Sequence, residues 1–231
     1  MKTWTDQLVF FDIDGTLLDT HGEGREAFIC GLEQVTGTPD DLSYVSFAGN
    51  TDRKVLGEVL ARRRMPWEEA AVPPLFECIA EALRKRLAHR PGTPVRGAGA
   101  LVARLRSLGA GLGLVTGNIR ACAYLKLASV GLDGFFPFGG FGDAHAERAD
   151  ILREALKAAE ATGWRVKADG VCLIGDTPYD VAAGQAVGVP VLGVASGRYT
   201  AFDLRKAGAA WAAEDFEQME EWLRRIWKPN G

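Results

Sequence analysis

Two carboxylates at the end of an apolar run are the residues best suited to chemistry in this sequence. Asp12 and Asp14 follow Leu8–Phe11 directly and lie two positions apart, and Gly15 after them permits a close turn. Side chains two positions apart on an extended chain point to the same side, so both carboxylates can face one site. One carboxylate can attack an electrophile and form a covalent intermediate, while the other moves protons for the leaving group and for water.

A second pair of carboxylates follows another apolar run. Asp176 comes soon after Val171–Ile174, and Asp180 follows four residues later at the start of a predicted helix. Together with Asp12 and Asp14 they form a set of oxygen ligands only, which Mg²⁺ prefers and which makes zinc a poor candidate. The alternative interpretation is that Asp176 and Asp180 are acids at a helix N-terminus that interact with the helix dipole.

A third polar stretch, Thr116-Gly117-Asn118, follows Leu112–Val115 and precedes a predicted helix. The hydroxyl of Thr116 and the backbone N–H groups of Gly117 and Asn118 form a candidate phosphate cradle. By itself the stretch also fits an ordinary turn and helix N-cap. Beside the carboxylates it indicates phosphoryl transfer, in which positioning and charge neutralisation do most of the catalysis.

A scaffold that brings these strand ends together is predicted by the alternation of strands and helices. The predicted strands are Leu8–Phe11, Leu112–Val115, Val171–Ile174 and Val191–Val194, and the predicted helices are Ala98–Leu108, Arg120–Val130, Ala149–Ala159 and Val181–Val187. This order favours a three-layer, doubly wound α/β fold with a parallel sheet covered on both faces. Ligands bind such a sheet outside the carboxyl ends of its strands, where the strand order reverses.

Residues 20–96 interrupt this alternation and show helical periodicity instead. We therefore predict a helical insert over 20–96 and a core domain made of 1–19 and 97–231. Gly and Pro residues at 19–22 and 90–94 are typical of hinges, and Thr51 is a candidate N-cap within the insert. At the other end of the chain, Trp222 is expected on an amphipathic helix that packs against the core.

Composition predicts an ordinary globular protein, with 47% hydrophobic and 25% charged residues. The formal net charge of −3 offers no bulk attraction for nucleic acid or for an anionic membrane. No apolar run approaches the roughly 18 residues of a membrane span, and the first residues do not resemble a signal peptide. We expect a cytoplasmic monomer whose four widely spaced cysteines are buried free thiols.

In order along the chain, the three polar motifs resemble those of the haloacid dehalogenase-like (HAD) hydrolase superfamily, and the resemblance spans nearly the whole sequence. The motifs are Asp12-Ile13-Asp14-Gly15-Thr16, Val115-Thr116-Gly117-Asn118 and Gly175-Asp176-Thr177-Pro178-Tyr179-Asp180. The resemblance implies that Asp12 is the nucleophile that forms an aspartyl-phosphate, that Asp14 is the general acid/base and that Thr116 binds the transferring phosphoryl group. It also implies a Mg²⁺ ion held by the Asp12 side chain, the Asp14 main-chain carbonyl and Asp176, with Asp180 as a further ligand or as the partner of a ligand.

The insert resembles the mobile helical cap of phosphoglycolate phosphatase and β-phosphoglucomutase relatives, which closes over the substrate and excludes water. In such caps a loop like Phe47–Arg53 faces the active site, so Asn50 and Arg53 are candidate substrate-binding residues. The alternative is a plain helix start capped by Thr51. Further residues expected to bind substrate, from the motifs themselves, are Gly15, Thr16, Gly117 and Asn118.

The sequence departs from the family at one point. Most relatives have a lysine at the start of the helix before the last motif, where it neutralises the nucleophile and the phosphate, but residues 142–150 contain no lysine. Arg148 is the candidate substitute, because a guanidinium stays charged and binds phosphate through two nitrogens. Lys157 is the other nearby cation, although it lies well inside the predicted helix.

The expected activity is that of a Mg²⁺-dependent phosphatase acting on a small phosphate monoester such as phosphoglycolate or a sugar phosphate, since an insert of this size should enclose the site. Asp14 argues against dehalogenation, which needs no acid for an alcohol leaving group. Thr16 favours a phosphatase only mildly, so a phosphomutase remains an alternative. A phosphonatase would need a cap lysine, and Lys54 and Lys85 have no recognisable context. A catalytically silent phosphate-binding module is the last alternative, because the usual lysine is absent.

Overall fold

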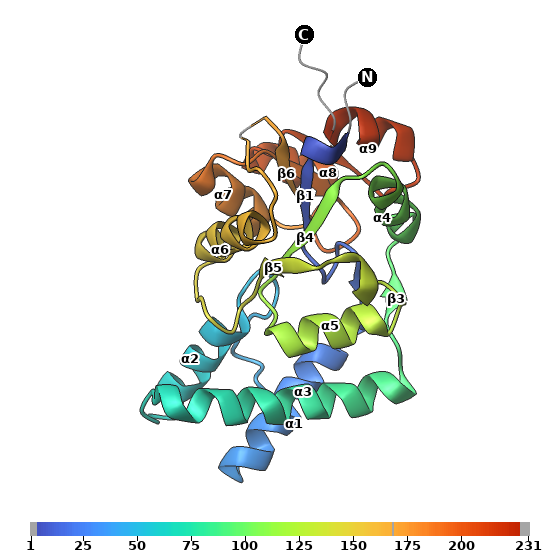
Figure 1. Ribbon diagram of the computed structural model, residues 1–231. Coiled ribbons are helices and arrows are strands. Elements are labelled where there is room, and N and C mark those ends of the chain that lie inside the picture. Colours follow the sequence, from blue (N-terminus) through green and yellow to red (C-terminus); the bar gives the residue numbers. More distant parts are fainter. Residues whose placement is uncertain (1–3, 168, 227–231) are drawn as a thin grey trace.

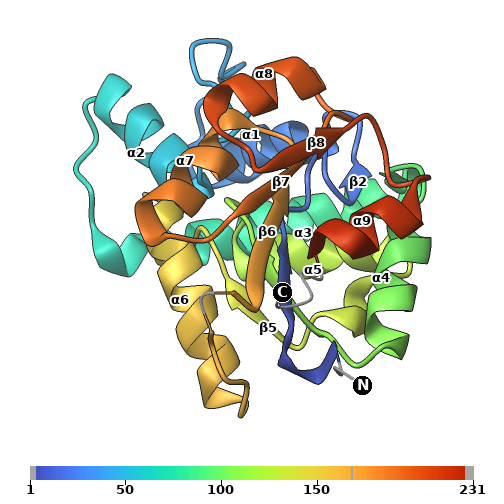
Figure 2. The ribbon, with the colours of Figure 1, turned by 90° about the horizontal axis from the view of Figure 1, so that it is seen from above.

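The computed structural model describes residues 4–167 and 169–226 and contains a six-stranded parallel sheet between layers of helices (Figures 1 and 2). The strands are β1 (Leu8–Phe11), β4 (Gly111–Val115), β5 (Phe138–Gly140), β6 (Val171–Gly175), β7 (Val191–Val194) and β8 (Trp211–Ala213). They lie in the order β5-β4-β1-β6-β7-β8, and every neighbouring pair is parallel. The predicted three-layer, doubly wound α/β fold is confirmed.

The central strand β1 is buried on both faces, which explains why its sequence is apolar without interruption. Val9 and Phe11 belong to one hydrophobic cluster, and Leu8 and Phe10 to another, because successive side chains point to opposite faces. Helices α4 (Ala98–Ser107), α5 (Arg120–Ala128) and α9 (Met219–Ile226) contribute to the first cluster, and α6 (Arg148–Ala161) and α7 (Pro178–Val187) to the second. Figure 2 shows α6 and α7 on one side of the sheet and α4 and α9 on the other.

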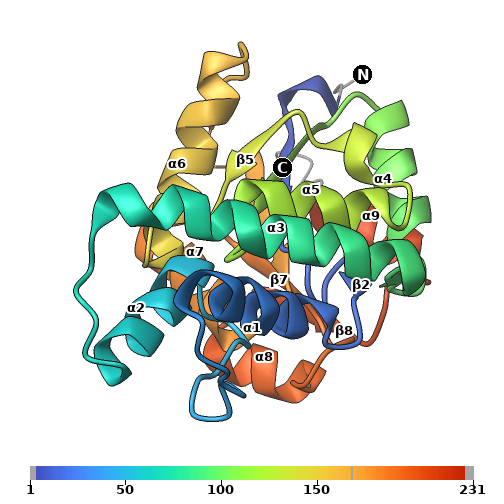
Figure 3. The same cartoon turned by 90° about the horizontal axis from the view of Figure 1, so that it is seen from below.

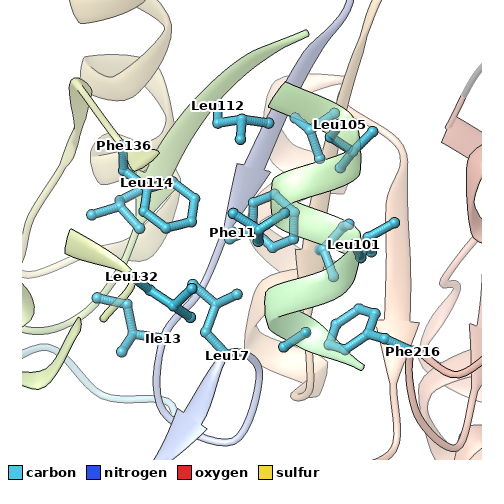
Figure 4. Packing of buried hydrophobic residues seen from close by; sticks show 14 of the residues in the cluster. Phe11, Ile13, Leu17, Leu101, Leu105, Leu112, Leu114, Leu132, Phe136 and Phe216 are labelled. Atoms are coloured by element: carbon cyan, nitrogen blue, oxygen red, sulfur yellow. The ribbon is translucent and has the colours of Figure 1, made fainter. Parts of the chain in front are cut away.

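Phe11 lies at the centre of the first cluster (Figure 4). Its ring meets that of Phe136 edge to face at 5.7 Å between centroids, and Leu101 and Leu105 of α4 lie on its other side. Edge-to-face packing adds about 0.5–1.5 kcal/mol to the burial of such rings. This packing holds the end of β1, and therefore the residue that follows it, in a fixed place.

The strand order reverses next to β1. The chain adds β4 and β5 on one side of β1, returns across the sheet, and adds β6, β7 and β8 on the other side. The described part of the chain also contains helix α8 (Ala201–Ala207) and three short 3₁₀ helices, Trp4–Asp6, Glu69–Ala71 and Asp133–Phe135. The carboxyl ends of β1, β4 and β6 are therefore neighbours at the position where an open α/β sheet binds its ligands.

The predicted insert contains helices α1 (Glu23–Thr36), α2 (Asp52–Arg62) and α3 (Val72–His89), which gather at one end of the sheet (Figures 1 and 3). Thr51 is the N-cap of α2, as predicted, and its side chain accepts the N–H of Lys54. The insert helices form their own hydrophobic cluster, which also contains Cys122 of α5 and Ile119, the residue before that helix. Because residues of the insert and of α5 share this cluster, the packing does not mark a boundary between two domains. The division into an insert over 20–96 and a core stays a prediction.

Two very short strands join the insert to the sheet. β2 (Leu18–Asp19) and β3 (Thr93–Pro94) pair antiparallel, so that Leu18 lies opposite Pro94 and Asp19 opposite Thr93. His21 lies 2.9 Å from Thr93, measured from its ring Nε2 to the hydroxyl oxygen. The Gly and Pro residues that predicted hinges therefore flank a two-stranded connection.

Several details differ from the sequence predictions. Strands β5 and β8 were not predicted, because three residues rich in Gly or Ala, Phe-Gly-Gly and Trp-Ala-Ala, carry no strand pattern. Cys122 and Cys172 are buried as expected, but the prediction was wrong for Cys30, which is exposed on α1, and Cys78 is intermediate.

The predicted helix at the end of the chain is confirmed, since α9 buries Trp222 completely. Residues 1–3, 168 and 227–231 of the predicted core domain lie outside the described residues. Within the described part of the chain, none of the helices has the length and apolar character needed to cross a membrane.

Candidate active site

A cavity of about 430 Å³ lies between the carboxyl ends of the central strands and the insert helices. The structure brings most of the predicted site residues to its wall: Asp12, Asp14, Gly15, Asn50, Thr116, Gly117, Asn118, Arg148 and Asp176. Thr16, Asp180 and Arg53 are not part of this wall. Thr16 and Asp180 are buried just behind it, where each contacts a lining residue.

Asp12 is a buried carboxylate immediately after β1, with 4% of its surface exposed. Its backbone N–H donates to the carbonyl of Ile174 at 2.9 Å, which continues the β1–β6 pairing by one residue. Burial raises the pKa of Asp12 to about 7, an effect that Arg148 opposes and that the charges of Asp180 and Asp14 reinforce. The residue expected to be the nucleophile is therefore harder to ionise at neutral pH than an exposed carboxyl, and a neighbouring cation favours its ionised form.

Arg148 supplies such a cation from the first residue of α6. Its Nη1 lies 3.3 Å from Oδ1 of Asp12 and also donates to Oδ1 of Asp180. Burial alone would lower the pKa of the guanidinium, but Asp12 and Asp180 raise it above its ordinary value. The arginine thus lies beside Asp12, where the sequence analysis proposed it as the substitute for an absent lysine. Its Nε is the one buried side-chain nitrogen or oxygen without a hydrogen-bond partner in the described parts of the chain.

Asp176 follows β6 and faces Asp12 across the strand ends, with 5% of its surface exposed. Its Oδ1 accepts the hydroxyl of Thr16 at 3.2 Å. Burial, followed by the charges of Asp12 and Asp180, raises the pKa of Asp176 to about 8. Gly15, whose φ is +77°, passes close by: a Cβ at this position would lie 2.3 Å from the Asp176 carboxylate. The turn after β1 therefore depends on this glycine for both its conformation and its space.

Asp180 makes two kinds of contact, and one of them is the helix N-terminal role that the sequence offered as the alternative to metal binding. One oxygen, Oδ2, accepts the backbone N–H and the hydroxyl of Thr177, which completes a capping box at the start of α7. The other oxygen, Oδ1, accepts from Arg148. Asp180 is fully buried. It caps α7 with one oxygen and holds the guanidinium beside Asp12 with the other.

A metal ion fits this cluster by the chemistry of its donors. Carboxylate oxygens of Asp12, Asp176 and Asp180 all lie within 4.8 Å of one another, and all are buried. Three crowded, buried carboxylates repel one another, and a single guanidinium offsets only part of that charge. An oxygen-only set of this kind matches a hard divalent cation such as Mg²⁺.

The loop between β4 and α5 places Thr116 and Asn118 side by side in the interior. The hydroxyl oxygen of Thr116 accepts both the side-chain amide of Asn118, at 2.8 Å, and its backbone N–H, at 3.3 Å. Gly117 between them leaves space for the insert, because a Cβ there would lie 2.3 Å from the carbonyl oxygen of Asn50. The loop is therefore closely covered by the insert in this structure.

Lys126, on α5, is the main lining residue that the sequence analysis missed. Its Nζ donates to both carboxylate oxygens of Asp14, at 2.7 and 2.6 Å, and to Oδ1 of Asn118 at 2.6 Å. Burial tends to lower the pKa of this amine, but Asp14 keeps it above its ordinary value. A signal was present in the sequence: Lys126 follows Cys122 by four residues and Ala123 by three, so it lies on the apolar face of its helix.

Asn50 and Arg53, both predicted to face the substrate, lie in different places. Asn50 lines the cavity, and its side-chain amide donates to the carbonyl of Ser46 at 2.8 Å. Arg53 lies outside the cavity wall, donates to the carbonyl of Asp143 at 3.1 Å, and pairs with Glu69. The structure therefore brings only one of the two predicted insert residues to the cavity.

Further contacts join the start of α2 to the core. The Asp52 backbone N–H donates to the Gly117 carbonyl at 2.8 Å, and the Asp52 carboxylate accepts the N–H of Ile119, also at 2.8 Å. The hydroxyl of Thr51 donates to the carbonyl of Ala146 at 3.0 Å. Burial raises the pKa of Asp52 to about 6, while Lys126 opposes that shift. The insert is held against the loops after β4 and β5 by these bonds.

The loop after β7 also reaches the cavity, which the sequence analysis did not predict. Ser196, Gly197, Arg198 and Tyr199 are part of its wall. The Ser196 hydroxyl donates to the carbonyl of Gly15, and a Cβ at Gly197 would lie 2.2 Å from the Asp176 carboxylate. These residues reach the cavity through packing across the sheet, and no local sequence pattern predicts that position.

Comparison with known proteins agrees with this geometry. Residues 9–194 match the family model described as haloacid dehalogenase-like hydrolase. A probable phosphatase, IndB, of Dickeya dadantii is 27% identical over 214 residues, covering 92% of this chain and 91% of the relative. A phosphoglycolate phosphatase of Rhodospirillum rubrum is 29% identical over 227 residues, covering 93% of this chain and 90% of the relative.

A solved structure shows the same fold. The crystal structure of CbbY from Rhodobacter sphaeroides in complex with phosphate superposes with a TM-score of 0.71 at 18% identity. The superposition covers 92% of this chain and 96% of that one. The arrangement of sheet, flanking helices and insert is therefore shared with it over nearly the full length.

Proposed function

The chain belongs to the haloacid dehalogenase-like hydrolase family, and we propose that it is a Mg²⁺-dependent phosphatase that forms an aspartyl-phosphate on Asp12. The observation that carries the proposal is the position of Asp12: a buried carboxylate on the cavity wall, beside the guanidinium of Arg148. A neighbouring cation favours the ionised form of a carboxylate, which is the form that can act as a nucleophile. The named phosphatases among the relatives support the same activity.

In the first step, an oxygen of Asp12 attacks the phosphorus of the substrate and the ester P–O bond breaks. Asp14 gives a proton to the departing alkoxide oxygen, so the alcohol leaves as a neutral molecule. The proposed roles of Thr116 and Arg148 are to bind the phosphoryl oxygens, through a hydroxyl and a guanidinium. Gly15, Gly117 and Asn118 shape the walls around the reacting group, and Thr16 supports Asp176 from behind the wall through its hydroxyl.

In the second step, a water molecule attacks the phosphorus of the aspartyl-phosphate while Asp14 takes its proton. The bond between phosphorus and the Asp12 oxygen breaks, inorganic phosphate leaves, and both carboxylates return to their starting states. One molecule of water is consumed for each ester bond broken. The insert helices over the cavity keep other water away from the covalent intermediate.

We propose that Asp12, Asp176 and the main-chain carbonyl of Asp14 hold the Mg²⁺ ion. Asp180, both of whose oxygens accept hydrogen bonds, is proposed as the residue that holds Arg148 and supports the ligands. When bound, the ion would neutralise charge on the transferring phosphoryl group and keep Asp12 ionised. The oxygen-only cluster supports this assignment.

The proposed substrate is a small phosphate monoester such as phosphoglycolate or a sugar phosphate. A cavity of about 430 Å³ lies within the usual range for a site that takes small molecules. Several relatives are named phosphoglycolate phosphatases. We further propose that the protein acts as a monomer on a cytoplasmic metabolite, with nucleic acid excluded as a partner by the net negative charge.

The test is phosphate release from a panel of small phosphate monoesters, with Mg²⁺, with a chelator, and with Asp12→Asn in parallel. We expect hydrolysis that requires the metal and that falls in Asp12→Asn to below about one thousandth of the wild-type rate. Asp133→Asn, which changes a carboxylate on a short 3₁₀ helix away from the cavity wall, is the matched control. Full activity of Asp12→Asn, or turnover that survives the chelator, would contradict the proposal. Folded wild-type protein that binds Mg²⁺ but releases no phosphate points to a phosphomutase or a silent module.

A further inference from the structure

Lys126 is a buried lysine with no part in the mechanism derived above. It lies within α5, and 5% of its surface is exposed. Burying an ammonium group is unfavourable unless it is paired and fully hydrogen-bonded. Its place on the cavity wall, in contact with Asp14, therefore requires an explanation.

The three N–H donors of the Lys126 ammonium are all in use. Two hydrogen bonds go to the two oxygens of Asp14 and the third goes to the side-chain oxygen of Asn118. No donor is left for a substrate anion in this arrangement. A lysine charged by its carboxylate neighbour is also a poor amine nucleophile, which argues against a covalent role.

Asp14, by contrast, depends on these bonds for its orientation. Its side chain is 44% exposed and lies on the turn after β1. Without the contacts from α5 and the loop before it, the carboxylate would be free to rotate. Besides the two bonds from Lys126, Oδ2 accepts the side-chain amide of Asn118 at 2.7 Å. Both donors come from α5 and the loop that precedes it, which are rigid neighbours of the reacting group.

The same network extends to the proposed phosphate-binding hydroxyl. The amide of Asn118 that contacts Asp14 also donates to the Thr116 oxygen at 2.8 Å. Lys126, Asn118 and Thr116 therefore form one chain of contacts from the proposed acid/base to the proposed phosphoryl site. A shift of Lys126 would change the direction of the Asp14 carboxylate relative to that site.

We propose that Lys126 is the positioning residue for Asp14, holding its carboxylate at the place from which it serves the leaving group and the attacking water. The inference rests on the proposed function, in which Asp14 is the general acid/base. Lys126 acts through Asp14 and contacts neither the substrate nor the phosphoryl group. Its contribution should therefore appear in kcat and disappear when Asp14 can no longer transfer protons.

The experiment measures kcat and KM for Lys126→Met, Asp14→Asn and the double variant, each with Mg²⁺. An alkyl phosphate from the active panel is the main substrate. The second substrate is p-nitrophenyl phosphate, whose leaving group departs with little protonation. The activity of Asp14→Asn therefore stays measurable with this substrate. We expect Lys126→Met to lower kcat for the alkyl phosphate by about 100-fold, the lower end of general acid–base contributions, with little change in KM. In the Asp14→Asn background, the same change should cause no further loss.

Lys157→Met is the matched control, since it makes the same substitution at an exposed position of α6 and should keep wild-type kinetics. Circular dichroism melting curves establish that every variant is folded. If Lys126→Met does not fold, Lys126→Gln, which retains a donor, replaces it in the same cycle.

Independent losses in the double variant, or a loss confined to KM, would overturn the inference, because they would make Lys126 a substrate-binding residue. Wild-type kcat in Lys126→Met would overturn it as well. In each of these cases an active wild type leaves the proposed phosphatase function intact. Folded wild-type protein without Mg²⁺-dependent phosphate release overturns the proposed function, and this inference with it.

Discussion

Arg148 contacts two carboxylates at once, and its charge therefore matters for both chemistry and folding. It lies between Asp12, the proposed nucleophile, and Asp180, the capping acid of α7. Removing one member of a buried charge cluster leaves the others uncompensated, which costs about 3–5 kcal/mol in typical cases. The position of the guanidinium also suits it to stabilise charge on a transferring phosphoryl group.

Arg148→Ala is expected to lower kcat by about 100-fold or more, because an aligned positive group is lost at the site of developing charge. Arg148→Lys should recover part of the activity, since it restores a charge without the two-nitrogen fork. The measurement is steady-state phosphate release. The control is Arg153→Ala on the same helix, where the half-exposed arginine pairs with Asp150. Near-normal activity of Arg148→Ala would contradict the assignment.

At the residue scale, the sequence predicts positions that follow a strand end and misses those that arrive from elsewhere. Asp12 and Asp176 could be placed because each directly follows a buried strand of the same sheet. Ser196 meets the site only through a side-chain contact across the fold, which no local pattern reveals. For Lys126 the helical spacing indicates an apolar face, but it does not indicate the contact with Asp14. Arg53 fits the pattern of a substrate-facing loop, yet its contacts with Asp143 and Glu69 turn it away from the cavity.

At the scale of elements, apolar runs that are buried on both faces were the easiest to predict. β1 and β7 have the predicted bounds, Leu8–Phe11 and Val191–Val194. β5 and β8 escape prediction, because their three residues gain their strand conformation from neighbours rather than from β-favouring side chains. Tertiary pairing decides the conformation of such short segments.

The crossing of α1 and α3 offers a test of element packing. At Gly31 of α1, an added Cβ would lie 2.6 Å from the side chain of Ile79 and 2.8 Å from its backbone. Gly31→Ala is therefore expected to destabilise the protein by about 1–3 kcal/mol, the usual cost of overpacking. Gly57→Ala in α2 is the matched control, because its nearest neighbour is 3.9 Å away and alanine favours a helix by about 0.5–1 kcal/mol. Urea denaturation measures both variants, and equal stabilities would contradict the packing argument.

At the scale of the whole molecule, the start of α2 fastens the insert to the core on one side of the cavity. Backbone and side-chain groups of Thr51, Asp52 and Arg53 bond to the loops after β4 and β5. The periodicity of the sequence predicts that residues 20–96 are helical, but it contains no information on how closely they approach the strand ends. That placement results from many weak contacts between segments far apart in the chain.

Arg53→Ala and Asn50→Ala should distinguish the attachment of the insert to the core from the recognition of the substrate. Arg53 contributes a hydrogen bond to the Asp143 carbonyl outside the cavity, worth about 1 kcal/mol, so its loss should lower kcat/KM roughly fivefold for every substrate. Asn50 lines the cavity, so its loss should change the ranking of substrates. The measurement is kcat/KM over the panel, with Arg62→Ala at the end of α2 as the control. A changed ranking in Arg53→Ala would place this residue in contact with the substrate.

Because Leu18 pairs with Pro94 and Asp19 with Thr93, the insert leaves the rest of the chain and returns to it at neighbouring points. Closing a longer loop between two fixed ends is cheap, since each doubling of its length costs only about 0.6 kcal/mol. A segment of different size or internal fold can therefore be grafted onto these two strands without moving the end of β1. Evolution can in this way exchange the insert, which is proposed to select the substrate, while it inherits the proposed reacting groups unchanged.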